Sequence, residues 1–342
     1  MKLIDLRSDT VTLPSPEMYE AIVSAELGDD VFAEDPTVNA LQEKATEITG
    51  KEAGLLVPSG TMGNLVSILT HCKRGTEAIL GDQSHTFLYE CGGISAYGGI
   101  HSRQLKNHPD GTMELSDIRK AVRSHDDHFP VTSLICLENT HNRCSGAPLS
   151  VDYMNSVSTI AKEKGVKIHV DGARIFNASV ALSVPVSILV ERAHSITFCM
   201  SKGLAAPVGS VICGTKDFIS GARRVRKSLG GGMRQAGVIA AAGLRSLNSM
   251  VDRIQEDHEN ARMLAEGLSD IPGIFVDTEN VCTNIVFFNM KVDHTFDPVE
   301  KMKDEGILFF QTSPGRFRLV THYGITADDI STALQCFSQL FN

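Results

Sequence analysis

The chain has 342 residues, a hydrophobic content of 42% and a formal net charge of −9. This length accommodates one large and one small domain, and the apolar content supplies a sizeable core. An acidic chain of this kind lacks the basic face that nucleic-acid binding requires, and its apolar runs are too short to cross a bilayer. Its first residues do not have the pattern of a signal peptide, so we expect a cytoplasmic protein.

The eight cysteines are scattered along the chain, and no two of them form a Cys-x-x-Cys pair. This distribution is typical of a reduced, cytosolic protein rather than of a disulfide scaffold or a zinc centre. The cluster from His125 to His128 contains metal-ligating residue types, but no further ligands follow at a useful spacing. We therefore expect a charged loop there, and no metal site.

The first elements in chain order are an extended polar segment, two helices and a strand. Residues 1–15 have no apolar pattern of their own, and we expect them to form an arm that lies across the rest of the protein. Prolines directly after Ser15 and after Asp35 mark two helix starts, and Gly50 ends the second helix. An apolar run over 53–57 predicts a strand.

The turn after this strand carries Gly60 and Thr61 at the start of an amphipathic helix. Backbone amides at a helix amino terminus bind phosphate groups, and the Thr61 hydroxyl adds another donor. Ser-Gly-Thr turns are common between strands and helices, so this one indicates a phosphate site only together with the residues described below.

His85 follows the next predicted strand, over 77–80. A histidine just past the carboxyl end of a strand can stack on a planar ring and exchange a proton near neutral pH. The alternative is a structural histidine that hydrogen-bonds to the backbone. Glu90 follows on a short helix and is a candidate to assist His85. Polar residues also follow the predicted strand over 131–137.

Two later strand ends carry the side chains on which the functional interpretation depends. One apolar, β-branched strand ends at Asp171, and Lys202 lies between the two apolar strands of residues 196–214. Ligands of open α/β sheets bind at the carboxyl ends of strands. A lysine between buried strands is costly to keep as an ammonium, and its amine forms a Schiff base with an aldehyde. The alternative is a lysine that extends to solvent.

Asp171 and Lys202 together form the arrangement that pyridoxal phosphate (PLP) requires. The lysine holds the cofactor aldehyde, and the carboxylate keeps the pyridine nitrogen protonated so that the ring accepts electrons. The alternation of strands and helices predicts an α/β fold with a mostly parallel sheet between helices. We expect a large PLP-binding domain over 1–248 and a small C-terminal α+β domain over 249–342.

Eight sequence blocks, taken in order, resemble one known family. They are LRSDT, GDDVFAEDPTVNALQ, PSGTMGNL, LENTHN, HVDGARIFNA, SKGLAAPVGS, GGGMRQAG and RLVTH. In these blocks the chain resembles the low-specificity L-threonine aldolases, which implies PLP-dependent transferase fold type I with a seven-stranded sheet. The resemblance also implies cleavage of L-threonine, L-allo-threonine and related β-hydroxy-α-amino acids to glycine and an aldehyde, through a Lys202 internal aldimine and a quinonoid.

The resemblance, with the residue patterns above, assigns individual roles. The expected cofactor contacts are Gly60, Thr61, His85, Asp171, Arg174, Lys202, Lys227 and Arg234. The expected catalytic residues are Lys202, His85, Asp171 and His128, with His128 as second candidate for the base. Ser8, Arg174 and Arg318 are expected to bind the substrate carboxylate, which an arginine fork holds by both oxygens. A turn cap for Ser8, a surface strand for Arg318 and a solvent-exposed loop for His128 are the alternatives.

The resemblance further implies self-association into a homotetramer, with sites at a dimer interface. Other activities on the same scaffold are alternatives, namely a β-eliminating amino acid lyase and a hydroxymethyltransferase. A relative of the same fold without activity is a third. A nicotinamide dehydrogenase is disfavoured, because no Gly-x-Gly-x-x-Gly follows the first strand.

Overall fold

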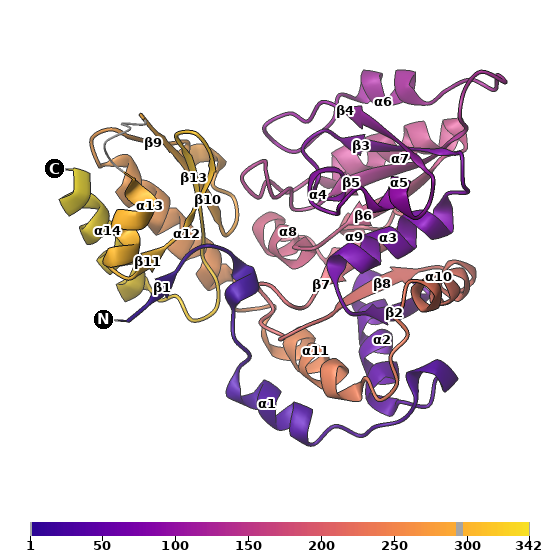
Figure 1. Ribbon diagram of the computed structural model, residues 1–342, viewed down its shortest axis with the longest axis horizontal. Coiled ribbons are helices and arrows are strands. Elements are labelled where there is room, and N and C mark those ends of the chain that lie inside the picture. Colours follow the sequence, from indigo (N-terminus) through magenta and orange to yellow (C-terminus); the bar gives the residue numbers. More distant parts are fainter. Residues whose placement is uncertain (1, 292–296, 342) are drawn as a thin grey trace.

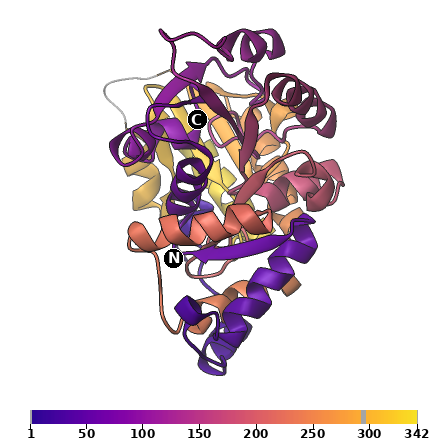
Figure 2. The same ribbon diagram turned by 90° about the vertical axis from the view of Figure 1, so that its right-hand side faces the viewer.

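The computed structural model describes residues 2–291 and 297–341, which form two parts built around separate sheets (Figure 1). The larger part is on the right of Figure 1, and the smaller part, with both chain ends, is on the left. Figure 2 shows the larger part from its side, with the indigo helices projecting at the bottom of the view.

The strands of the larger part form one seven-stranded sheet, and those of the smaller part form a four-stranded sheet and a two-stranded pair. The strands of the large sheet are β2 (Ala53–Val57), β3 (Glu77–Gly81), β4 (His101–Leu105), β5 (Thr132–Glu138), β6 (Lys167–Asp171), β7 (Ser195–Cys199) and β8 (Ser210–Gly214). The others are β1 (Ile4–Asp5), β9 (Ile274–Val276), β10 (Ile285–Met290), β11 (Ile307–Leu308), β12 (Phe310–Ser313) and β13 (Arg316–Val320).

Helices flank the large sheet and cover the small one. Those of the larger part are α1 (Pro16–Val23), α2 (Pro36–Thr49), α3 (Gly60–His71), α4 (His85–Leu88), α5 (Gly93–Ala96), α6 (Leu115–Ala121), α7 (Val151–Lys164), α8 (Ile175–Leu182), α9 (Val186–Leu189), α10 (Lys216–Ser228) and α11 (Gly237–Ser249). The smaller part has α12 (Ile254–Ser269), α13 (Pro298–Asp304) and α14 (Ala327–Phe341). None of these helices, over the residues described, is both long and apolar enough to span a membrane.

The large sheet has the strand order β2-β8-β7-β6-β5-β3-β4, and β8 runs antiparallel to both of its neighbours. The other strands share one direction, so the predicted mostly parallel seven-stranded sheet is confirmed. Successive side chains of β2 point to opposite faces: Leu56 packs with Val38 of α2, whereas Leu55 packs with Val66 of α3. Both faces are therefore covered by helices, which places the ligand-binding edge at the strand ends.

Local sequence signals account for the boundaries of α2. The Asp35 carboxylate accepts a hydrogen bond from Val38 N at 3.0 Å, which satisfies an amide that the first helical turn leaves free. Gly50 follows the helix with φ at +65°, a conformation that glycine adopts without steric cost.

The amino-terminal arm joins the two parts. Its strand β1 pairs in parallel with β11, and Ile4 and Leu6 lie in the core of the smaller part. The chain then forms a 3-10 helix, Asp9–Val11, from which Asp9 reaches Arg174 at the start of α8. The arm thus contributes to the sheet structure of the smaller part before it reaches the edge of the large sheet.

Asp9 and Arg174 form a buried, two-pronged ion pair. Arg174 Nε and Nη2 donate to the two carboxylate oxygens at 2.6 and 2.7 Å, and Asp9 has no exposed surface. Burial alone would raise the pKa of Asp9, but the charge and hydrogen bonds of Arg174 outweigh it and lower the pKa to about 2. The Asp9 carboxylate thus depends on Arg174 to remain ionised inside the protein.

Asp9→Ala removes one partner of this pair and leaves the Arg174 charge buried without a counter-charge. We expect the free energy of unfolding to fall by about 3–5 kcal/mol, measured by urea denaturation. Glu47→Ala, which removes the exposed partner of Lys44 on α2, should cost less than about 1 kcal/mol. Equal losses in the two variants would contradict the stabilising role assigned to the buried pair.

Candidate active site

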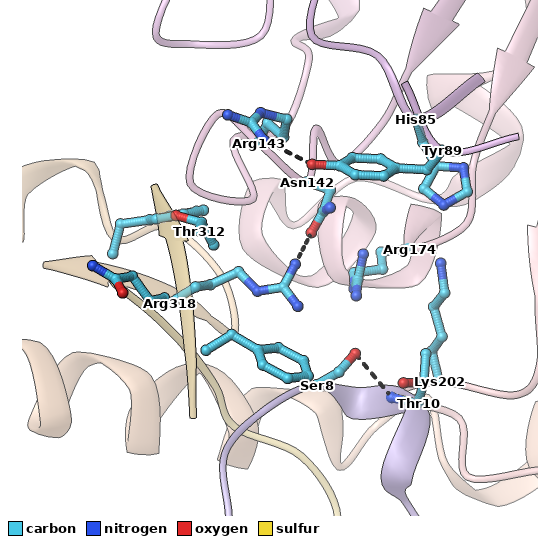
Figure 3. A pocket seen from close by; sticks show the side chains of 13 residues that line it. Ser8, Thr10, His85, Tyr89, Asn142, Arg143, Arg174, Lys202, Thr312 and Arg318 are labelled. Atoms are coloured by element: carbon cyan, nitrogen blue, oxygen red, sulfur yellow. Dashed lines mark hydrogen bonds between the residues drawn. The ribbon is translucent and has the colours of Figure 1, made fainter. Parts of the chain in front are cut away.

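Five of the predicted residues line one cavity at the carboxyl edge of the large sheet (Figure 3). They are Ser8, His85, Arg174, Lys202 and Arg318. The cavity has a volume of about 470 Å³, and side chains of β10, β12 and β13 close it from the smaller part. The two sheets and the arm thus meet around this space.

Lys202 follows β7 in the segment that turns back into β8. Its carbonyl accepts a hydrogen bond from Ala205 N at 2.8 Å, which holds this segment in a tight turn. Its side chain points into the cavity (Figure 3), and no described residue gives its amine a hydrogen bond or an ion pair. An amine free of partners in a cavity is suited to form a covalent bond with an aldehyde.

Asp171 is buried at the end of β6, where Asn64 of α3 orients it. Asn64 Nδ2 donates to Asp171 Oδ2 at 2.8 Å, and Ala173 N donates to Oδ1 at 3.1 Å. The same Asn64 amide donates to Glu90 Oε1 at 2.8 Å. One neutral side chain thus binds two buried carboxyl groups, and the sequence analysis did not identify it.

Gly63 explains how α3 brings Asn64 so close to the sheet. A Cβ atom at this position would clash with the Thr197 side chain of β7. The helix therefore packs against the strand at a distance that a larger residue would prevent.

A series of hydrogen-bonded neutral side chains leads from Asn64 away from the cavity. His169 Nε2 lies 3.1 Å from Asn64 Oδ1, and Ser195 Oγ lies 2.8 Å from His169 Nδ1 and 2.7 Å from His71 Nε2. Because Asn64 donates to two carboxyl groups, its oxygen faces His169, which must carry its proton on Nε2. Ser195 then donates to His169 and accepts from His71. Each hydrogen bond of this series therefore has its donor pointing toward the two carboxyl groups.

The pKa values of the two histidines agree with this arrangement. Burial lowers the pKa of His169 to about 4 and that of His71 to about 3. Both rings are therefore neutral near pH 7, as the hydrogen-bonded series requires, because each imidazole in it carries one N–H.

His85 and Glu90 form a second pair of ionisable groups beside Asp171. His85 Nδ1 lies 2.9 Å from Glu90 Oε1. Burial raises the pKa of Glu90, and the charge of Asp171 raises it further. Burial alone would lower the pKa of His85, but its hydrogen bond to Glu90 and the charge of Asp171 raise it. The pair can therefore hold a proton near neutral pH and pass it to a group in the cavity.

The ligand atoms of His85, Glu90 and Asp171 lie within 4.8 Å of one another, a spacing that metal ligands also have. The hydrogen bonds of Asn64 to both carboxyl groups and of His85 to Glu90 account for this spacing. The donor set thus fits a proton-holding cluster.

Arg318 of β13 forms no ion pair with a carboxylate of the described residues. Nη1 donates to Asn142 Oδ1 at 2.9 Å and Nη2 to the Arg7 carbonyl at 3.1 Å, while buried Nε has no partner among the described residues. Burial lowers its pKa to about 10, and the charge of Arg174 contributes. A guanidinium held by neutral acceptors is suited to bind an incoming carboxylate.

Arg174 and Ser8 also reach the cavity, but both are engaged with the arm. Arg174 uses two of its donors on Asp9. Ser8 Oγ accepts from Thr10 N at 3.3 Å and donates to Asp9 Oδ1 at 3.4 Å, so it is a turn cap as well as a cavity residue. Arg318, whose two acceptors are neutral, is therefore the arginine whose charge is more available to a ligand.

Gly60 and Thr61 lie at the start of α3, outside the cavity wall. Ser59 Oγ caps the helix by accepting from Met62 N at 3.2 Å, and the first-turn amides of Gly60 and Thr61 have no partner within the helix. A Cβ at Gly60 would lie 2.7 Å from Cys199 Sγ, at the end of β7. These amides therefore lie beside the strand that leads to Lys202, where they fit a phosphate group.

Three further predicted residues, all at exposed positions, are not part of the cavity wall within a single chain. Lys227 is exposed at the end of α10, and Arg234 Nη1 donates to Asp29 Oδ2 at 2.9 Å. The side chain of His128 is 89% exposed and contacts Asp126 at 2.7 Å. The loop alternative considered for His128 matches its position in this chain.

Comparison with solved structures shows which fold the chain adopts. A threonine aldolase of Leishmania major superposes with a TM-score of 0.85 at 16% identity, over 99% of this chain and 100% of that one. A high-resolution structure of SPT with a PLP internal aldimine superposes with a TM-score of 0.77 at 19% identity, over 98% and 87% of the two chains. The fold is fold type I of the PLP-dependent enzymes, as the sequence predicted.

The beta-eliminating lyase family matches residues 5–291. The low-specificity L-threonine aldolase 1 of Arabidopsis thaliana is 50% identical over 346 residues, which cover 99% of this chain and 96% of that protein. The chain belongs to the beta-eliminating lyases and, within them, to the low-specificity L-threonine aldolase family.

His169→Gln tests the neutral chain behind Asp171, because a glutamine amide can still donate to Asn64. An unfolded histidine titrates near pH 6.5, whereas folded His169 titrates at about 4. As the pH falls below 6.5 the unfolded state binds a proton that the folded state does not, so the free energy of unfolding decreases. Between pH 7 and 5 the wild type should lose about 2 kcal/mol more than the variant in urea denaturation. Equal losses would contradict a neutral His169.

Proposed function

We propose that this protein is a PLP-dependent enzyme that cleaves L-threonine, L-allo-threonine and related β-hydroxy-α-amino acids to glycine and an aldehyde. The observation that carries the proposal is the unpartnered Lys202 amine in one cavity with the unpaired Arg318 guanidinium, next to the strand that ends at Asp171. One group suits an aldehyde and the other suits a carboxylate, which is the combination an amino acid enzyme of this class needs.

The residues around the cavity fit the cofactor. Bound PLP supplies an aldehyde and a ring that accepts an electron pair from the substrate Cα. Lys202 would hold the aldehyde, and the buried Asp171 carboxylate would pair with the protonated ring nitrogen. The amides of Gly60 and Thr61 would bind the phosphate. His85 would cover the ring face.

Arg318 would bind both oxygens of the substrate carboxylate, with Ser8 and the remaining donors of Arg174 beside it. Holding the carboxylate fixes the rotation of the amino acid and so selects which bond at Cα is broken. Because Asp9 neutralises Arg174, Arg318 is the one of these two guanidinium groups whose charge a substrate carboxylate would compensate.

His85 would take the proton of the β-hydroxyl group as the Cα–Cβ bond breaks, and its hydrogen bond to Glu90 would stabilise the protonated ring. Protonation of Cα then completes glycine. His128 stays a second candidate for the base. Its exposure means that this role requires a movement of its loop or a neighbouring chain.

We further propose a cytoplasmic homotetramer in which two chains complete each site. Lys227 and Arg234 would then contact the cofactor phosphate or a carboxylate in a neighbouring chain, which agrees with their exposure here. Residues 1–248 and 249–342 would be the two domains, with the arm over 1–15 linking them.

Product analysis tests the reaction. Purified protein incubated with PLP and L-threonine should release glycine and acetaldehyde in equal amounts, measured by coupled reduction of the aldehyde and by amino acid analysis. Lys202→Ala should lower kcat by about 10³-fold or more, because it removes the covalent attachment. Lys120→Ala, an exposed lysine of α6, is the control. Formation of 2-oxobutanoate and ammonia from L-threonine instead would indicate β-elimination and contradict the proposal.

Arg318→Lys tests carboxylate binding, because lysine retains the charge but loses the two-pronged geometry. We expect kcat/KM for L-threonine to fall by about tenfold or more. Arg119→Lys, on the exposed face of α6, should leave kcat/KM unchanged. An unaltered kcat/KM in Arg318→Lys would show that another group binds the carboxylate.

A further inference from the structure

A second cavity, of about 500 Å³, adjoins the first. Arg143 and Phe287 line both cavities, so the two spaces share part of their walls. The second cavity lies between the segment after β4 and strand β10, with Lys106 and Arg316 among its lining residues. None of the roles described above involves it.

Positive charge is concentrated in this second cavity, although the whole chain carries a net charge of −9. Lys106, Arg143 and Arg316 line it, against a single carboxylate, Asp277, which accepts from Asn280 at 2.6 Å. None of the three cationic side chains forms an ion pair with a carboxylate of the described residues. An anionic ligand would supply the missing counter-charge.

The two arginines are close and unevenly satisfied. Arg316 Nη2 donates to the Arg143 carbonyl at 3.4 Å, and its guanidinium lies over the Phe287 ring at 4.2 Å. Burial lowers the pKa of Arg316, and the charge of Arg143 lowers it further. Arg143 Nε is buried and has no partner among the described residues. A bound anion would compensate both charges and could accept a hydrogen bond from the free Arg143 Nε.

Tyr89 connects the second cavity to the reaction centre. Its ring packs against that of His85, with the ring centres 5.6 Å apart, and its hydroxyl accepts from Arg143 Nη1 at 2.6 Å. Figure 3 shows this sequence of His85, Tyr89 and Arg143 along one side of the cavity. A β-substituent that leaves the β-hydroxyl at His85 and extends along Tyr89 therefore approaches Arg143.

We propose that the second cavity binds a terminal anionic group, a carboxylate or a phosphoryl group, on the β-substituent of the substrate. The proposal rests on the aldol cleavage proposed above and names the substrate class that the enzyme favours. The Cα–Cβ bond breaks, the β-hydroxyl proton goes to His85, and Cα gains a proton. The products are glycine and an aldehyde that carries the anionic group.

The test compares substrates that carry an anionic or a neutral group at the same ring position, of which the carboxylate and the carboxamide are matched in size. The wild-type holoenzyme should cleave β-(4-carboxyphenyl)serine or β-(4-phosphonophenyl)serine with a kcat/KM at least about tenfold above that of β-(4-carbamoylphenyl)serine. The preference should decrease at high ionic strength. The acid with the larger increase in kcat/KM over the amide identifies which anionic group, carboxylate or phosphoryl, the second cavity prefers. L-Threonine is assayed in parallel, so that failure of the proposed function is recognised separately.

Arg316→Gln should reduce the preference for the acids about tenfold. Lys106→Gln, at an exposed position that tolerates substitution, should also reduce this preference. Lys120→Gln, which removes a lysine that lines neither cavity, should keep it. Circular dichroism checks that each variant is folded. If L-threonine is cleaved but the acids and the amide react equally well, or if both subsite variants retain the preference, the inference is overturned.

Discussion

The buried ion pair between Asp9 and Arg174 is the interaction on which the geometry of the site depends. Asp9 belongs to the arm, whose first strand pairs with the smaller part, and Arg174 begins the helix after β6 of the large sheet. The pair therefore holds the smaller part against the edge of the large sheet where Lys202 lies. It also neutralises one of two neighbouring guanidinium groups, so that Arg318 keeps an unpaired charge facing the cavity.

A second constraint acts from behind the site. Asn64 donates to Asp171 and Glu90, and the neutral histidines at 169 and 71 fix its orientation through Ser195. Donors directed at two carboxyl groups stabilise negative charge there without adding a buried positive charge. Under the proposed function, the positive charge that would pair with Asp171 is that of the protonated cofactor ring.

Local signals allowed the sequence to predict the sheet and two central residues. Asp35 and Gly50 mark the ends of α2 through contacts within a few positions, and Asp171 and Lys202 stand out because they follow apolar strands. Contacts between residues far apart in the sequence could not be predicted from such local patterns. Asp9 and Arg174 are 165 positions apart, and Asn64 gains its role from Asp171 and His169 of β6 and from Glu90 between α4 and α5. In the sequence alone, a helix-capping residue, a buried amide and an ion-pair partner cannot be distinguished, because their partners are distant in the chain and meet only in the folded protein.

The most direct test of the account is to identify the residue that binds the cofactor. The purified protein is incubated with PLP, reduced with borohydride and digested, and the peptides are analysed by mass spectrometry. We predict that the peptide containing Lys202 carries a phosphopyridoxyl group. When the reduction is omitted, the same peptide of the wild type should carry no such group, because the bond to the cofactor is then reversible. A label on another lysine, or no label on any peptide, would contradict the assignment of this cavity as the cofactor site.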